Sequence, residues 1–213
     1  MSTAPSRPGV VPHIASWSAE NLPKNLPEPV IAFAGVGGIA YPDETPEDRD
    51  DRGVLWRRQG DAQGEGKAQY GKVHGPRQRE VMHRLLCQVC GGPADRDDRG
   101  MLWLLEDNRT DWKDWPENLL TAHPPVCLPC ARQAVVDCPH LLKGSVAVRV
   151  AASDVCAVYG MVYSPAGLRP MPLHLDVVAY GGRMAPWVLA GQLVRGLNGC
   201  TIVDLRAELD GRH

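Results

Sequence analysis

The sequence predicts a mixed α+β fold, and three patterns support this prediction. Residues 48–56 recur at 95–103 with eight of nine positions identical, and each copy places an acidic cluster and a glycine before an apolar run. That order is typical of a turn followed by a strand. Other segments carry residues that typically start or stop helices. Apolar residues also alternate with polar ones through much of 146–205. We expect hairpins and a few helices in one compact unit.

Helices are expected at 76–86, 127–139 and 185–198. Pro76 suits the first turn of a helix, whereas Pro139 cannot continue one. The third helix would turn Trp187, Ala190, Val194 and Leu197 inward and end at Gly199. Strands are expected at 30–34, 54–56, 101–105, 146–150, 155–163, 173–180 and 200–205, whereas the Gly-, Gln- and Lys-rich residues 60–75 are typical of a loop.

The strongest signal is a pair of CxxC motifs, Cys87-Gln88-Val89-Cys90 and Cys127-Leu128-Pro129-Cys130. Four thiolates satisfy the tetrahedral coordination of a structural Zn²⁺ ion. The glycines after Cys90 permit a tight knuckle, and the second pair opens a predicted helix, whose free amides favour thiolates. A knuckle, a hairpin and a helix in this order predict a treble-clef-like zinc core, with residues 111–116 as an insertion.

The predicted fold therefore has three parts. Residues 1–29 carry six prolines and few apolar residues, which predicts an extended arm. Residues 30–145 hold an N-terminal β-hairpin region and the zinc core. Residues 146–213 form a C-terminal β-α-β portion packed on the same unit.

Composition excludes several classes of protein. The 213 residues contain 23 Lys and Arg against 25 Asp and Glu, a net charge of −2, which excludes binding to nucleic acid by bulk charge. No stretch approaches the ~18 apolar residues of a membrane-spanning helix, and the first ten residues lack a secretory signal. We expect a cytoplasmic protein that makes no membrane contact, and no small-molecule substrate is indicated.

The three remaining cysteines, Cys138, Cys156 and Cys200, are expected to be small buried side chains rather than ligands. Cys138 would lie about 12 Å along the helix from Cys130, too far for the same ion. A reduced cytoplasmic environment favours metal binding over disulfides for the paired cysteines. The acidic turns of the repeat are expected to pair with their neighbouring arginines.

An enzymatic alternative is an HNH-like nuclease, since Glu117-Asn118-Leu119-Leu120 precedes the second CxxC pair. Such enzymes need a histidine base on the hairpin, yet 91–120 contains no histidine and His123 is the nearest candidate. With four thiolates, the zinc ion also has no position open for a catalytic water. We therefore expect a non-enzymatic, zinc-stabilised binding protein, or a degenerate descendant of such a nuclease.

A local basic segment gives this binding protein a candidate ligand. Residues 57–86 carry a net charge of +4 and lead into the first CxxC motif. The arginines expected to contact DNA or RNA phosphates are Arg77, Arg79, Arg84 and, on the second helix, Arg132. The alternatives are a solvated helix face, or a role in binding another protein through exposed Trp112 and Trp115.

The chain resembles a group of uncharacterised double-CxxC zinc-binding proteins of high-GC Gram-positive bacteria. The resemblance rests on residues 77–94, on 124–131 and on the closing 200–205, and extends over about residues 39–205. It implies a self-standing zinc-binding protein, and the four cysteines are the only functional residues that it transfers.

Overall fold

The computed structural model describes residues 9–21, 31–32, 37–141, 144–164 and 170–211. The chain forms two compact units, unit 1 with residues 1–14, 80–155 and 195–213, and unit 2 with residues 15–79 and 156–194. The predicted α+β class is confirmed. The predicted boundaries after residues 29 and 145 do not mark this division, because both units combine segments from before and after residue 145.

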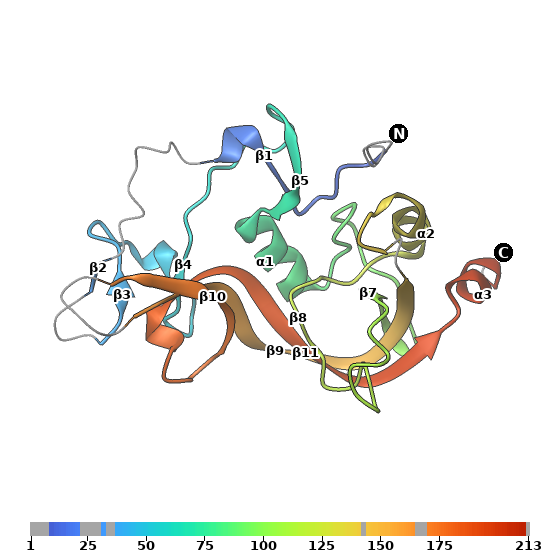
Figure 1. The fold of residues 1–213 in the computed structure, drawn as a ribbon. Coiled ribbons are helices and arrows are strands. Elements are labelled where there is room, and N and C mark those ends of the chain that lie inside the picture. Colours follow the sequence, from blue (N-terminus) through green and yellow to red (C-terminus); the bar gives the residue numbers. More distant parts are fainter. Residues whose placement is uncertain (1–8, 22–30, 33–36, 142–143, 165–169, 212–213) are drawn as a thin grey trace, which may run out of the picture. The chain divides into compact units, whose positions relative to one another are not determined.

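Most of the secondary structure lies in strands (Figure 1). The elements of unit 1 are the end of α1 (Gly75–Arg84), β6 (Arg96–Asp97), β7 (Gly100–Glu106), β8 (Leu120–Thr121), α2 (Leu128–Asp137), part of β9 (Ser145–Tyr163), part of β11 (Val188–Val203) and α3 (Leu205–Asp210). Those of unit 2 are β1 (Ala15–Trp17), β2 (Ile31–Ala32), β3 (Ile39–Ala40), β4 (Leu55–Trp56), β5 (Ala68–Val73), the first half of α1, the rest of β9 and β11, β10 (Pro172–Ala179), and 3-10 helices at Ser18–Glu20, Pro46–Asp48 and Ala185–Trp187.

The described strands form one sheet of seven and two of two. The larger sheet has the order β4-β11-β9-β7-β6, with β10 also paired to β9 and β8 to β11, and the smaller ones are β1-β5 and β2-β3. Figure 1 shows β9 and β11 as long continuous ribbons, and each contributes residues to both units. The two long strands, β9 and β11, therefore pair with most of the other strands of the larger sheet.

β7 is buried on both faces, which explains why its sequence is a continuous apolar run. Met101, Trp103 and Leu105 point into one cluster with Val148 of β9. Leu102 and Leu104 alternate with them and pack in a second cluster with Cys87, Val126, Leu128, Ala131 and Ala147. Because successive strand residues face opposite sides, β7 divides the core of unit 1 into two layers.

Two of the predicted elements are wrong, and two predicted strands are joined into one. The residues expected to form a helix at 185–198 form a 3-10 turn and then β11, so the C-terminal portion is not β-α-β. This segment contains Gly191 and Gly196, which weaken a helix, and it finds strand partners in β4, β8 and β9. The strands expected at 146–150 and 155–163 are one strand, β9. Residues 60–75 include β5, which pairs with β1.

β1 also corrects the predicted arm, because residues 15–20 are part of unit 2. Glu20 is 1% exposed and its carboxylate accepts hydrogen bonds from the Arg77 guanidinium at 2.5 and 2.9 Å. The same guanidinium donates to the Ala15 carbonyl of β1 at 2.7 Å. A buried ion pair thus fixes this segment against α1; residues 1–8 and 22–30 of the predicted arm lie outside the described residues.

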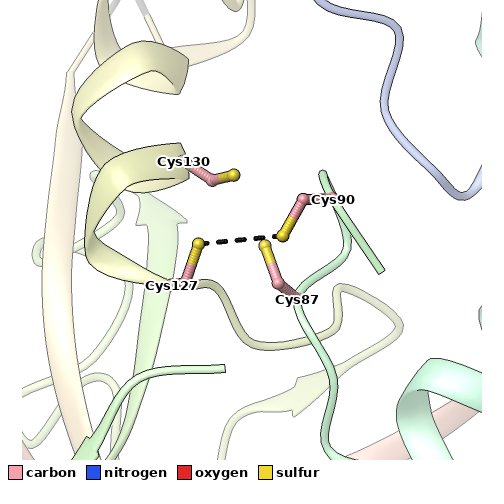
Figure 2. Close-up of side chains that lie close together, drawn as sticks. All are labelled: Cys87, Cys90, Cys127 and Cys130. Atoms are coloured by element: carbon pink, nitrogen blue, oxygen red, sulfur yellow. Dashed lines mark hydrogen bonds between the residues drawn. The ribbon is translucent and has the colours of Figure 1, made fainter. Parts of the chain in front are cut away.

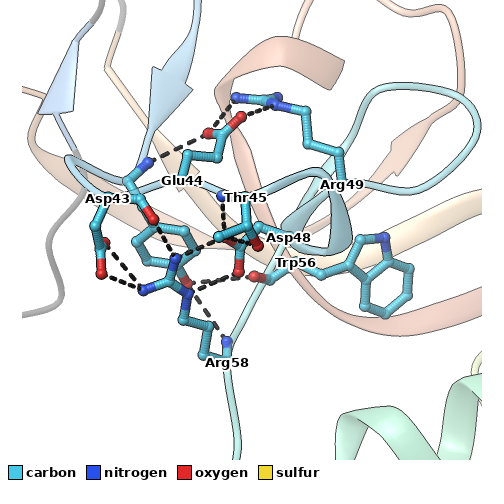
Figure 3. A network of polar contacts seen from close by, with 8 residues as sticks. Asp43, Glu44, Thr45, Asp48, Arg49, Trp56 and Arg58 are labelled. Carbon is cyan, nitrogen blue, oxygen red and sulfur yellow. Dashed lines mark hydrogen bonds and ion pairs between the residues drawn. The ribbon is translucent and has the colours of Figure 1, made fainter.

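The first copy of the repeat forms a polar network in unit 2 (Figure 3). Arg58 donates to both carboxylate oxygens of Asp48, at 2.7 and 2.6 Å, and also to Asp43. The hydrogen bond from Arg58 lowers the pKa of Asp48 to about 2. Asp50 accepts from the backbone of the turn, from the Trp56 indole at 2.9 Å and from the Tyr180 hydroxyl at 2.8 Å. Asp48 and Asp50 therefore hold the turn in place and bond it to Trp56, Arg58 and Tyr180.

The second copy forms the β6-β7 hairpin and surrounds a buried arginine. Arg149 of β9 is fully buried and lies 2.6 Å from Asp95, 3.4 Å from Asp97 and 2.5 Å from Glu208 of α3. Arg99 pairs with Asp97, as expected from the sequence, and with Glu208 at 2.7 Å. The carboxylates neutralise the buried guanidinium and attach α3 to the sheet.

The glycines of the two repeats should respond differently to alanine. Both have a positive φ, 78° at Gly53 and 119° at Gly100, but a Cβ at Gly53 meets nothing within 4 Å whereas one at Gly100 would lie 2.1 Å from the Val150 carbonyl oxygen. We expect Gly53→Ala to lower the free energy of unfolding by about 1 kcal/mol and Gly100→Ala by about 3 kcal/mol or more. Urea unfolding monitored by circular dichroism measures both, and equal losses would contradict the close contact at Gly100.

The Arg149 cluster should make stability depend on pH. Burial raises the pKa of Glu208, but Arg149 and Arg99 outweigh it and hold that pKa below its usual range. A carboxylate whose pKa is lower in the folded chain than in the unfolded chain stabilises the fold at pH values above its unfolded-state pKa, which is about 4.3 for glutamate. This contribution is lost as the pH falls through the folded-state pKa. We expect Glu208→Gln to lower the free energy of unfolding by about 2 kcal/mol at pH 7 and much less near pH 3. A loss that is the same at both pH values would contradict this assignment.

Candidate metal centre

The first cysteine pair lies in a tight turn between α1 and β6. The Cys87 N–H donates to the Gly92 carbonyl at 2.7 Å, and the Gly91 N–H donates back to the Cys87 carbonyl at 2.8 Å. Gly91 has φ of 71°, and a Cβ there would approach the His13 ring to 3.0 Å. The glycines predicted to permit a knuckle do so, and the turn brings Cys87 and Cys90 to the same side.

The second pair lies at the start of α2. Cys127 is the N-cap residue, with extended backbone, and Pro129 occupies the first turn, where a missing N–H costs no helical hydrogen bond. The Ala131 N–H donates to the Cys127 carbonyl at 2.9 Å, which closes the first turn beside Cys130. The predicted helix start near Cys127 is confirmed.

The two pairs converge on one point, as Figure 2 shows. The four Sγ atoms all lie within 4.8 Å of one another, and those of Cys90 and Cys127 are 3.9 Å apart. A tetrahedral Zn²⁺ site with Zn–S bonds of about 2.3 Å places its sulfurs about 3.8 Å apart. Cys87, Cys90, Cys127 and Cys130 could therefore hold a metal ion with little movement, and the all-sulfur donor set fits zinc.

Backbone hydrogen bonds hold the two cysteine segments together independently of a metal. The Gln88 N–H donates to the Pro125 carbonyl at 3.0 Å, beside the two CxxC motifs. The Val126 N–H donates to Leu102 of β7, and the Asp95 N–H donates to the Val126 carbonyl, both at 3.0 Å. The hairpin between the cysteine pairs is thus bonded to the segment that carries the second pair.

The electrostatics of the cluster favour a cation. Burial raises the pKa of Cys127 to about 11 and also raises the pKa of Cys130, where the neighbouring Cys127 and Cys87 side chains add to the effect. Partial burial raises the pKa of Cys90 too, but the Gly92 backbone amide and the surrounding cysteines outweigh it and lower that pKa. Four thiolates in so small a volume would repel one another, and a divalent cation would remove that repulsion.

A segment that the sequence did not connect with the cysteines also supports the knuckle. The N–H groups of His13 and Ile14 donate to the carbonyls of Val89 and Gln88, at 2.8 and 3.3 Å. Gly9 donates to the Asp137 carboxylate at the end of α2, at 3.2 Å. No motif marks residues 9–14, so only the tertiary structure shows that they lie over the site.

The other cysteines lie outside this cluster. Cys138 is the C-cap residue of α2, the Cys156 thiol donates to the Val194 carbonyl, and the Cys200 thiol donates to the Pro116 carbonyl. All three are half-buried rather than fully buried. Within the described part of the chain, the four paired cysteines are the only group of three or more His, Cys, Asp and Glu side chains placed to hold a metal ion.

The predicted nucleic-acid contacts occupy very different environments. Arg77 is 7% exposed and its guanidinium bonds Glu20, so it serves the fold of unit 2. Arg79 stacks over the Trp56 ring, 4.5 Å from its centre. Arg84 and Arg132, both in unit 1, are exposed, and Arg84 pairs with Glu80 one helical turn away.

The structure also shows the environments of His123, Trp112 and Trp115, the residues named for the alternative functions. The His123 carbonyl accepts a hydrogen bond from the Trp103 indole at 2.9 Å, and its own N–H donates to the Thr121 hydroxyl. Trp112 is 40% exposed, whereas Trp115 is 6% exposed and belongs to the core. The expectation of two exposed tryptophans therefore fails at Trp115.

Comparisons with known protein families, with curated proteins and with solved structures found no match to this chain. No helix in the described residues is long and apolar enough to cross a membrane.

Removing one predicted ligand should abolish tight metal binding. We expect the chain to bind one Zn²⁺ ion, and Co²⁺ in its place to show the absorption of tetrahedral thiolate coordination. Cys130→Ser should lose this spectrum and lower the free energy of unfolding of unit 1 by several kcal/mol, because metal affinity in such sites is also folding free energy. Cys138→Ser, on the same helix, is the matched control and should keep both properties. Full thermal stability after chelation would contradict a structural metal.

Proposed function

We propose that this chain is a non-enzymatic, zinc-stabilised binding protein with a treble-clef-like core. The observation that carries the proposal is the convergence of four Sγ atoms, from two separate segments, within 4.8 Å. Cys87, Cys90, Cys127 and Cys130 would hold the ion, which when bound cross-links the knuckle to α2. Because all four positions of the tetrahedron are filled by thiolates, the site favours a structural role.

The order of the elements supports the treble-clef assignment. The first pair lies in a knuckle, β6 and β7 form an antiparallel hairpin after it, and the second pair opens α2. The residues between hairpin and helix include β8, which pairs with β11, and this accounts for the long spacing between the motifs. The Glu117 carboxylate accepts the N–H groups of Gly199 and Cys200 in β11, at 2.9 Å each, and so fixes the insertion.

We further propose that the zinc-bearing unit contacts nucleic acid through Arg84 and Arg132. Both are exposed, one at the end of the helix before the knuckle and one in the helix that carries the second cysteine pair. Two phosphate contacts give weak, sequence-independent and salt-sensitive binding, in agreement with the nearly neutral net charge. No observation in the described residues favours the HNH-like nuclease.

The arginine proposal is tested by retention of a radiolabelled DNA or RNA duplex. The zinc-loaded chain should retain it at low ionic strength and lose it as salt rises, whereas Arg84→Glu/Arg132→Glu should bind at least about tenfold more weakly. Lys113→Glu/Arg183→Glu is the control, because it reverses the same number of exposed charges at positions outside α1 and α2. Binding that is absent at low salt, or that the double substitution leaves unchanged, would refute nucleic-acid contact while leaving the metal site intact.

A further inference from the structure

β10 is an edge strand of the larger sheet. It runs antiparallel to β9, with Leu175 opposite Met161 and Val177 opposite Tyr159. None of the other described strands pairs with its second edge. A strand in this position presents unpaired backbone groups, which are a template for another strand.

The hydrogen bonds of the strand show which residues face the free edge. The Tyr180 N–H donates to the Cys156 carbonyl, so even-numbered positions from 174 to 180 direct their backbone groups toward β9. Leu175 and Val177 therefore direct theirs outward. In agreement, the Val177 N–H donates at 2.7 Å to the Asp176 side chain of its own strand rather than to β9.

The same strand exposes an apolar stripe. Leu173, Leu175 and Val177 alternate with polar residues on one face, and they are 54%, 55% and 39% exposed. The intervening residues His174 and Asp176 are exposed as well, so neither face of this stretch is covered. Isolated exposed apolar residues are common, but a stripe of them beside an open strand edge indicates a protein partner.

We propose that β10 pairs with β10 of a second copy of this chain, antiparallel, about a two-fold axis at Leu175. In this register Leu175 meets its own counterpart, and Leu173 meets Val177 of the second copy. His174 meets Asp176 of the second copy, twice by symmetry. Each apolar side chain of the stripe then faces an apolar one, and each His174 imidazole faces an Asp176 carboxylate that can accept a hydrogen bond from it.

The charges select this register over its neighbours. An axis at residue 174 would place two histidines opposite each other, and an axis at residue 176 would place two aspartates opposite each other. With the axis at Leu175, the outward backbone groups of Leu175 form a hydrogen-bonded pair with their counterparts, which makes His174 and Asp176 a non-hydrogen-bonded pair with closer side chains. Within one chain His174 Nε2 and Asp176 Oδ2 are already 3.6 Å apart, on one face of the strand.

Pairing also gives the Val177 N–H a better partner. Opposite Val177 lies Leu173 of the second copy, whose carbonyl can accept that N–H in place of the Asp176 carboxylate. Asp176 is then released to pair with His174 of the second copy. The interface needs residues of unit 2 alone, and it is independent of the cysteine cluster.

Sedimentation velocity of the full chain tests this proposal. Between about 1 µM and about 500 µM, a range suited to a small interface, the mass should rise from 23.2 kDa toward twice that value. Leu175→Asp places two carboxylates together on the axis and should keep the chain monomeric, with an unchanged circular dichroism spectrum because the residue is exposed. Val136→Asp, at a 68% exposed apolar position of α2, is the control and should still dimerise.

A charge exchange tests the register itself. His174→Glu places a glutamate opposite Asp176 of the second copy and should weaken dimerisation by about tenfold or more. Adding Asp176→Lys restores opposite charges and should recover most of that loss. A chain that stays monomeric throughout, a dimer that Leu175→Asp leaves intact, or a double variant no better than His174→Glu would each overturn the proposal.

Discussion

The convergence of four cysteine sulfur atoms on one point is the constraint on which the structure of unit 1 depends. The fold brings the sulfurs of Cys87, Cys90, Cys127 and Cys130 within 4.8 Å, although burial opposes the ionisation of two of them. Without a cation the cluster must remain largely protonated, and with one it becomes a cross-link between two segments. The core cluster that contains Cys87 also contains residues of β7 and α2, so the cysteine cluster and the hydrophobic core join the same elements.

A second buried charge plays a comparable part in unit 1, on the same face of β7 and β9 as Leu102 and Ala147. Arg149 is surrounded by carboxylates from the repeated acidic turn and from α3, and its burial is tolerable only because they are present. The repeat thus serves two different ends: Asp50 organises a turn around Trp56 in unit 2, whereas Asp95 and Asp97 neutralise an arginine in unit 1. Two nearly identical sequences acquire different roles because their tertiary neighbours differ.

Local signals in the sequence predicted the cysteine cluster, the start of α2 and the turns of the repeat, because spacing, prolines and glycines act over a few residues. Interactions between distant residues were not predictable in this way. The segment 185–198 has apolar residues at helical spacing, yet strand partners from three other segments make it β11. The sequence made Arg77 a candidate phosphate ligand. In the structure its guanidinium pairs with Glu20, which lies 57 positions earlier, and no local pattern in the sequence predicts this ion pair.

The Glu20–Arg77 pair has a consequence for how the chain tolerates shortening. Glu20 follows β1 closely in the sequence. A truncation just after Glu20 would therefore remove β1 together with the Glu20 carboxylate. Arg77 would keep its place in α1 but lose the counter-charge in its buried site, a change that typically costs several kcal/mol. Residues 15–20 are therefore an integral part of unit 2, and a truncation that removes them would remove part of its fold.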